Sequence, residues 1–224
     1  MHNWLNRLER RLYKYNIPPI MRYIVFAMGG VFLLDLFLGM TTAYTARVSL
    51  ISYLTLNIPA VLQGQIWRLV TWLFVPQQGS IFWMALSLYF YYMIGLGLEN
   101  QWGKVRFNLY YAVGMLGSII AALITGYGSN MFLNLSLFFA YAALYPDEQV
   151  LLFMFLPIKM KYLALADAAL YLYYFIVGGA STRVTIVLCL LNVFLFLGGD
   201  IINTIRRESR YWKTRYNFRK AMRK

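Results

Sequence analysis

Long apolar runs separated by short polar segments dominate the pattern along this chain. Several of these runs approach the roughly 20 apolar residues that a helix needs to cross a bilayer. We predict six transmembrane spans, at residues 20–40, 81–98, 107–126, 131–145, 162–178 and 185–205. The third span also carries small residues that would let neighbouring helices approach closely, namely Gly114, Gly117, Ser118, Ala121 and Ala122. The predicted fold class is an all-α polytopic membrane protein.

The segment between the first two spans is ambiguous. Residues 48–75 are apolar enough to suggest a seventh span, but polar or helix-breaking residues interrupt them at Asn57, Pro59, Gln63, Gln65 and Arg68. A seventh crossing would also export a tail that carries nine basic residues. We therefore predict that residues 41–80 form a long external loop, partly embedded in the membrane, with its backbone polar groups covered by protein.

Composition and charge support this interpretation and add a topology. Of the 224 residues, 61% are hydrophobic and 13% are charged, which is more apolar surface than a soluble globule of this size buries. Of the 21 lysines and arginines, five lie in the N-terminal arm and the first residues of span one (Arg22), nine in the tail and four in loops on the same side. Only Arg47, Arg68 and Arg183 fall on the other side. Basic residues accumulate on the cytoplasmic side, so both termini are predicted to be cytoplasmic.

The chain is predicted to hold one membrane domain at residues 20–205, preceded by a basic amphipathic arm at 1–19 and followed by a basic tail at 206–224. Basic charge next to membrane spans favours the bilayer and its anionic lipid headgroups as partners, and we expect no nucleic acid. Cys189 is the only cysteine, which excludes an intrachain disulfide and a cysteine cluster for metal. We expect no metal and no cofactor.

Polar side chains inside the predicted spans offer few catalytic pairs. A serine nucleophile needs a base, most often histidine, and the single histidine, His2, lies in the arm, far from Ser136 in the fourth span. Intramembrane acids are costly and usually functional, and here they are Asp35, Asp167 and Asp200. Asp167 and Asp200 could lie at similar depths, as in an aspartyl protease, and all three could line a path for protons or solutes. We favour structural hydrogen bonding for these carboxyl groups.

Four stretches, in the family's order, resemble the rhomboid superfamily. They are GQIWRLVTWLFVP in the long first loop, GLENQWGKVRFNLYY between spans two and three, AYAALYPDEQVLLFMFLPIKMKYL after span four, and a glycine pair in span six. The resemblance covers most of residues 20–205 and implies a six-helix rhomboid-like bundle with a long embedded first loop. The residues that match the family motifs are Trp67, Arg68, Glu99, Gly103, Pro146, Gly198 and Gly199.

The departures from the rhomboid pattern imply a member without its protease chemistry. Aligned on AYAALYP, the position of the nucleophile falls on Met131, and that of the base falls on Leu191 or Asn192. The pair that helps to hold the oxyanion in rhomboids falls on Trp83 and Ser87. The nucleophile, the base and the oxyanion donors are therefore all replaced.

The resemblance thus implies a derlin-like pseudoprotease that binds transmembrane helices of client proteins, between spans two and five, and aids their quality control or trafficking without cleaving them. The alternatives are an intramembrane protease with a non-standard catalytic pair, Asp167 and Asp200, and a small polytopic transporter. The stretches LFVPQ and PIKMKYL favour a bacterial plasma membrane over the endoplasmic reticulum.

Overall fold

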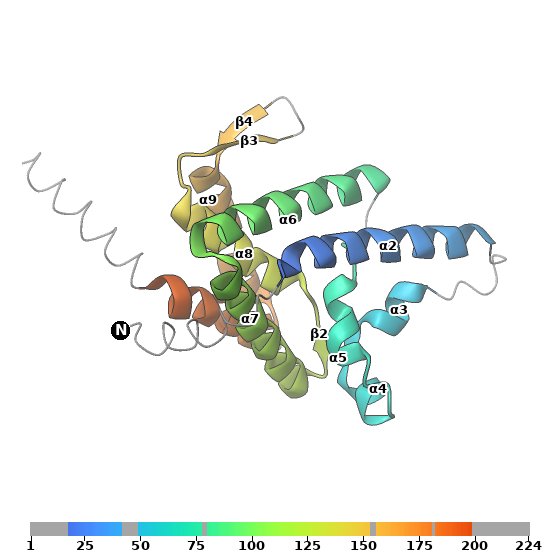
Figure 1. Cartoon of the computed structure of the whole chain (residues 1–224). Coiled ribbons are helices and arrows are strands. Elements are labelled where there is room, and N and C mark those ends of the chain that lie inside the picture. Colours follow the sequence, from blue (N-terminus) through green and yellow to red (C-terminus); the bar gives the residue numbers. More distant parts are fainter. Residues whose placement is uncertain (1–17, 42–48, 78–79, 153–155, 181, 199–224) are drawn as a thin grey trace, which may run out of the picture.

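The computed structural model describes residues 18–41, 49–77, 80–152, 156–180 and 182–198, and most of them are helical (Figure 1). Four helices are long and apolar enough to cross a membrane. They are α2 (Ile20–Thr41), α6 (Ile81–Trp102), α7 (Lys104–Thr125) and α9 (Met160–Val177). Two apolar helices are shorter, α8 (Met131–Leu144) and the helix Thr182–Gly198, called the 182–198 helix below. The chain is therefore a multi-pass membrane protein, and its six crossings stay a prediction.

Two glycines end helices in conformations that other residues avoid. Gly103, between α6 and α7, has a φ of 81° and a ψ of 157°, and its N–H donates to the Glu99 carbonyl at 2.8 Å. Gly126, after α7, has a φ of 87°, and its N–H donates to the Ala122 carbonyl at 2.7 Å. Since only glycine adopts positive φ without steric cost, these two positions set where the helices stop.

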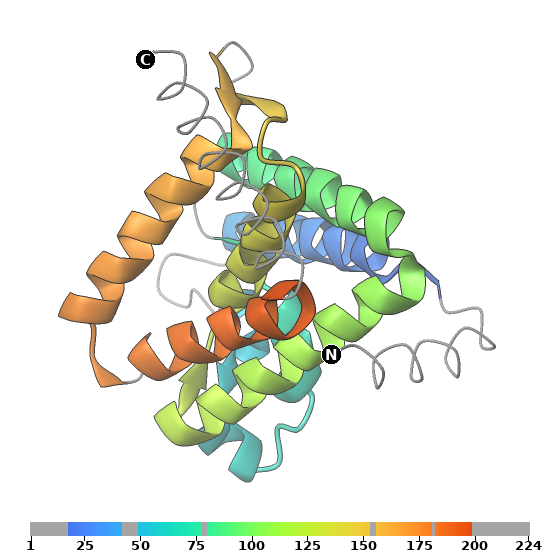
Figure 2. The same cartoon turned by 90° about the vertical axis from the view of Figure 1, so that its left-hand side faces the viewer.

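The short helix α8 lies in the middle of the bundle. It contacts α6, α7 and α9, while α2 packs beside α6. Figure 1 shows α2 and α6 running alongside each other, and Figure 2 shows α9 on the opposite side of α8 from them. Figure 2 shows α9 and the 182–198 helix meeting at a turn and diverging from it.

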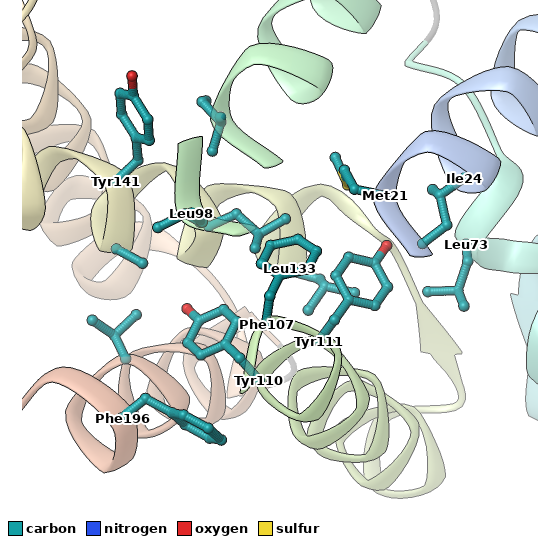
Figure 3. Packing of buried hydrophobic residues seen from close by; sticks show 14 of the residues in the cluster. Met21, Ile24, Leu73, Leu98, Phe107, Tyr110, Tyr111, Leu133, Tyr141 and Phe196 are labelled. Atoms are coloured by element: carbon teal, nitrogen blue, oxygen red, sulfur yellow. The ribbon is translucent and has the colours of Figure 1, made fainter. Parts of the chain in front are cut away.

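The core forms where α2, η1, α6, α7, α8 and the 182–198 helix meet (Figure 3). The Tyr110 and Phe196 rings stack edge to face with centroids 5.1 Å apart, a favourable aromatic geometry. Glycines allow the close approach of helices: a Cβ at Gly114 would lie 2.5 Å from Leu133 Cδ1, and one at Gly97 would clash with Tyr141. Close approach through small residues, as predicted for span three, therefore occurs at Gly114.

The segment between α2 and α6 forms only short elements, none of which could cross a bilayer. They are α3 (Leu50–Leu54), β1 (Leu56–Asn57), α4 (Ile58–Leu62), α5 (Arg68–Thr71) and the 3-10 helix η1 (Trp72–Phe74). Strand β1 pairs antiparallel with β2 (Tyr127–Gly128), so this loop is tied to the connection between α7 and α8. Gly128 is needed there because a Cβ would lie 2.5 Å from Leu56 Cδ2.

A β-hairpin joins α8 to α9 and is a departure from the all-α prediction. Strands β3 (Gln149–Leu152) and β4 (Leu156–Lys159) pair antiparallel, with Gln149 opposite Lys159. Asp147 lies 2.8 Å from Lys161 Nζ and 3.6 Å from Lys159 Nζ. The hydrogen bond and charge of Lys161, with those of Lys159, hold the pKa of the Asp147 carboxyl below its usual value.

Candidate functional site

The start of α8, where the rhomboid resemblance puts the nucleophile, is packed against the first loop. Met131 is the first residue of α8 and its side chain is 40% exposed. Its backbone N–H donates to the Ser129 hydroxyl at 3.2 Å. Asn130 is buried, and its Nδ2 donates to the Val75 carbonyl at 2.6 Å and to the Leu73 carbonyl at 3.4 Å. Asn130 therefore links the C-terminal end of η1 to the N-terminus of α8 through hydrogen bonds.

The two positions proposed for the base residue point in different directions from the 182–198 helix. Leu191 is 48% exposed, whereas Asn192 is 3% exposed. Asn192 Nδ2 donates to the Tyr110 carbonyl at 3.4 Å, and it would meet a Cβ at Gly114 at 2.7 Å. The same Cβ would meet Leu133, so Asn192 lies next to α7 close to the first turn of α8. An amide does not accept a proton as a histidine does.

The two positions that match the oxyanion pair lie on α6 and make local contacts. Trp83 is half exposed. The Ser87 hydroxyl donates to the Trp83 carbonyl at 2.9 Å, one turn back along the same helix. Such back-bonding satisfies the hydroxyl without a tertiary partner.

Further polar groups surround α8 deeper in the bundle. The Ser136 hydroxyl donates to the Leu133 carbonyl at 2.7 Å, and the Tyr110 hydroxyl donates to the Ser136 carbonyl at 2.9 Å. The Tyr91 hydroxyl accepts from Gln77 Nε2 at 2.8 Å and lies beside Asn134. These groups in the first half of α8 are amides, phenols and a hydroxyl, which are poor bases at neutral pH, whereas near its C-terminal end the Tyr141 hydroxyl donates to the Glu148 carboxylate.

The Trp-Arg pair of the first loop stabilises the loop itself. Arg68 is only 6% exposed, and its Nη1 donates to the Ser52 and Thr55 carbonyls at 2.8 and 2.9 Å. Its Nε donates to Gln65 Oε1 at 2.7 Å. Trp67 is half exposed, with Nε1 3.4 Å from the Tyr53 carbonyl. The guanidinium thus donates to carbonyl groups at the end of α3, where the Ser52 carbonyl also accepts from the Thr55 hydroxyl at 3.1 Å.

The structure does not gather the intramembrane acids described here. Asp35 of α2 accepts from the Ser49 hydroxyl at 3.1 Å and from the Ile51 N–H at 3.4 Å, at the start of α3. Asp167 lies on α9, which packs on α8 and β4. Asp200 lies outside the described residues, as does His2, so the pair of Asp167 with Asp200 stays a prediction.

The other motif residues lie at helix ends. Glu99 is buried in α6, and its Oε2 makes no hydrogen bond within the described part of the chain. Gly103 forms the turn after α6. The Pro146 carbonyl accepts from the Lys161 N–H at 3.1 Å, which joins the end of α8 to the start of α9. Gly198 is the last described residue of the 182–198 helix, and Gly199 lies outside the described residues.

Sequence reasoning missed Asn130 and the Gln77–Tyr91 pair. Asn130 contacts carbonyls 55 and 57 residues away, and Gln77 contacts Tyr91 from outside helix α6, 14 residues earlier, so no helical or strand spacing indicates them. The one available signal was polarity: Asn130 and Gln77 flank long apolar runs, where a buried amide needs a partner.

Helices α6 and α9 flank α8 on two sides. Both pack on α8, and no comparable packing joins α6 to α9 over the residues that the structure describes. Large apolar side chains remain exposed on both helices, among them Phe82 and Tyr89 of α6 and Leu170 and Tyr174 of α9. Phe138 of α8 is only partly buried. On α8 itself most described side chains are buried, so the exposed apolar surface around it belongs mainly to α6 and α9.

One comparison with known proteins identifies a family. A family profile described as "Eukaryotic integral membrane protein (DUF1751)" matches residues 26–197, which is most of the chain. No curated protein and no solved structure matches the chain. The family is described as eukaryotic, which does not favour the bacterial plasma membrane that two sequence stretches suggested. The chain therefore belongs to the DUF1751 family of integral membrane proteins, whose domain is one of the rhomboid-like superfamily.

Proposed function

We propose that this protein binds transmembrane helices of other membrane proteins at the side formed by α6, α8 and α9, and holds them without cleaving them. Quality control or trafficking of such client proteins is the role that this activity would serve. The observation that carries the proposal is the arrangement around α8: α6 and α9 both pack on it, with no comparable packing between α6 and α9 over the described residues.

The length of α8 supports the proposal. Its 14 residues span about 21 Å at roughly 1.5 Å per residue, whereas the hydrocarbon core of a bilayer is about 30 Å thick. A helix that is too short for its membrane thins the bilayer locally or recruits partners. A client helix with polar residues would meet a lower barrier next to α8 than in bulk lipid.

The groups at the head of α8 support binding without cleavage. Met131 presents a thioether where the resemblance puts a nucleophile, and Asn192 presents an amide next to the base position. Neither group can take a proton from a hydroxyl at neutral pH. A scaffold with these groups can hold a helix but lacks the usual means of attacking its backbone.

Site-specific photocrosslinking tests the binding surface. A photoreactive residue at Tyr89 of α6 or at Leu170 of α9 should capture membrane proteins in the native membrane. The same residue at Leu123 of α7, which is as exposed, serves as the matched control. Capture that is equal at all three positions, or absent at all three, would contradict the proposed surface.

The non-cleaving part needs a separate measurement. The purified protein in liposomes, mixed with a captured client, should leave that client intact over hours. Fragments that appear with the wild-type protein and disappear with Asp167→Asn would instead indicate the aspartyl alternative.

A further inference from the structure

An apolar pocket of about 400 Å³ lies between α8, α9 and the 182–198 helix, on the opposite side of α9 from the proposed client surface. Figure 2 shows these two outer helices diverging from the turn that joins them, with α8 between them. Its walls are aromatic and aliphatic, and they include Phe139, Ala168, Leu172, Phe175, Ile186 and Leu190. Its size is within the range of small-molecule and cofactor sites. The client surface proposed above does not use this pocket.

The positively charged side chain of Arg183 lies at one end of the pocket. Arg183 lies in the first turn of the 182–198 helix, and Ile186, Val187 and Leu190 follow it at the spacing of one helix face. Its Nε donates to the Phe175 carbonyl at 2.9 Å and its Nη2 to the Ile176 carbonyl at 3.0 Å. Since Phe175 also lines the pocket, these two bonds fix the guanidinium at the pocket's rim.

No acidic side chain among the described residues forms an ion pair with Arg183. Over the described ranges the ion pairs involve Asp147 with Lys159 and Lys161, at the opposite end of α9. Arg183 is exposed, and its Nη1 has no hydrogen bond to the described residues. A guanidinium has five N–H donors, so three remain for a ligand after the two carbonyls are served.

Two other basic residues are predicted to lie on this side, and one of them is described by the structure. Arg68 is buried against the carbonyls of the first loop, and Arg47 lies outside the described residues. A rigid, exposed guanidinium next to an apolar pocket at the edge of a membrane bundle matches one ligand chemistry. That ligand has an anionic oxygen group on a hydrocarbon chain.

We propose that this pocket binds one phospholipid, with an acyl chain between α9 and the 182–198 helix and the phosphate on Arg183. The lipid comes from the leaflet that faces the turn between these helices. At the pocket, side chains leave the space between α9 and the 182–198 helix unfilled. The bound lipid would fill this space and so hold the two helices together.

A photoreactive phospholipid tests the pocket. The probe is a phosphatidylcholine with a diazirine in its acyl chain, incorporated at a trace level into nanodiscs of unlabelled phosphatidylcholine that hold the full-length chain. Labelling should concentrate on peptides from α9 and the 182–198 helix. Ala168→Trp fills the pocket and should lower that labelling about tenfold. Ala169→Trp, an exposed position on the same helix outside the lining, should leave it unchanged.

A second comparison tests the phosphate contact. The Arg183→Gln variant should lose labelling by the phospholipid about tenfold, since charge-assisted hydrogen bonds to phosphate are among the stronger ones. A diacylglycerol probe with the same diazirine chain should label wild type and Arg183→Gln equally and weakly. Arg183→Lys should restore part of the phospholipid labelling.

Three results would overturn the proposal. The first is equal labelling of α7 around Leu123, which would indicate ordinary annular lipid. The second is unchanged lipid labelling in Ala168→Trp. The third is that Ala168→Trp keeps its lipid labelling but loses client capture from the photoreactive residue at Leu170, which would make the pocket part of the client site. Because lipid labelling and client capture are read separately, either proposal can fail alone. If Arg183→Gln unfolds on loss of its carbonyl contacts, Ala168→Trp decides.

Discussion

Arg68 donates to three oxygens of the first loop, and two of these are backbone carbonyls at the end of α3. In water such carbonyls would be hydrated, but a loop embedded at membrane depth needs donors from protein. The Thr71 hydroxyl adds a fourth contact of this kind, to the Leu54 carbonyl at 3.1 Å. One basic side chain therefore replaces part of the solvent around this loop.

Arg68→Met should destabilise the protein, because it keeps the apolar stem and removes the donors. The Thr55 carbonyl would lose its Arg68 donor, and a buried carbonyl without a donor costs about 1–3 kcal/mol, while the Ser52 carbonyl keeps the Thr55 hydroxyl. We expect a lower free energy of unfolding in detergent, together with faster proteolysis within residues 49–74. Arg22→Met, at an exposed arginine of α2, is the control and should change little. Equal stability of the two variants would mean that the Arg68 contacts contribute nothing.

Alanine substitutions at two glycines of α7, three residues apart, distinguish a role of glycine in close packing from a role in helix flexibility. Gly114→Ala places a methyl group 2.5 Å from Leu133 and 2.7 Å from Asn192, and overpacking of this kind costs about 1–3 kcal/mol. Gly117→Ala meets nothing within 4 Å and should be neutral or slightly stabilising. Thermal unfolding of both variants, in the same detergent, is the measurement. A similar decrease in both would indicate that α7 needs glycine for another reason than packing.

Single residues also show what sequence reasoning can reach. The polarity of Arg68 and the small size of Gly114 are visible in the sequence, so their importance could be predicted. Their partners could not, because Ser52, Thr55 and Asn192 come together with them only through the fold. Asn130 went unnoticed for the same reason: its carbonyl partners are 55 and 57 residues away.

At the scale of elements, the boundaries of the apolar helices follow closely from hydropathy. The span predicted at residues 81–98 is α6, which continues to Trp102 because Leu98, Glu99 and Trp102 are buried. The hairpin of β3 and β4 was not predicted, since its strands lie in one apolar run, QVLLFMFLPIK, without alternation. Strands β1 and β2 have two residues each, too few for any sequence signal.

The pairing of β1 with β2 makes a testable claim about where the first loop sits. The Ile58 N–H donates to the Gly126 carbonyl at 2.9 Å, so Asn57 and Tyr127 form the adjacent pair without mutual hydrogen bonds. Such pairs have Cα atoms about 4.5 Å apart, which suits a disulfide. Asn57→Cys with Tyr127→Cys should therefore crosslink efficiently on mild oxidation, as seen by altered gel mobility.

The wild-type chain suits this experiment, because its single cysteine, Cys189, is buried and should not compete with the introduced pair. Asn57→Cys with Thr125→Cys is the matched control, since Thr125 belongs to α7 and is not a partner in the ladder. More efficient crosslinking in the control than in the predicted pair would show that the loop does not meet the α7–α8 connection in this register.

At the scale of the whole molecule, charge and helix ends together predict the topology. Lys104 begins α7 on the side of the chain that holds most basic residues, while Tyr127 follows α7 at its other end and is exposed. If α7 crosses the bilayer, a cysteine at each position must face opposite compartments. An impermeant maleimide added to intact, right-side-out membranes should therefore label Tyr127→Cys but not Lys104→Cys.

Permeabilised membranes should label both variants, which controls for burial. Asp147→Cys, in the exposed segment after α8, extends the test to the short central helix: it should behave like Lys104→Cys if α8 crosses as well. Labelling of Asp147→Cys from outside would mean that 14 residues do not carry the chain back through the membrane. In that case α8 would be a re-entrant element, and the side formed by α6, α8 and α9 would face one leaflet only.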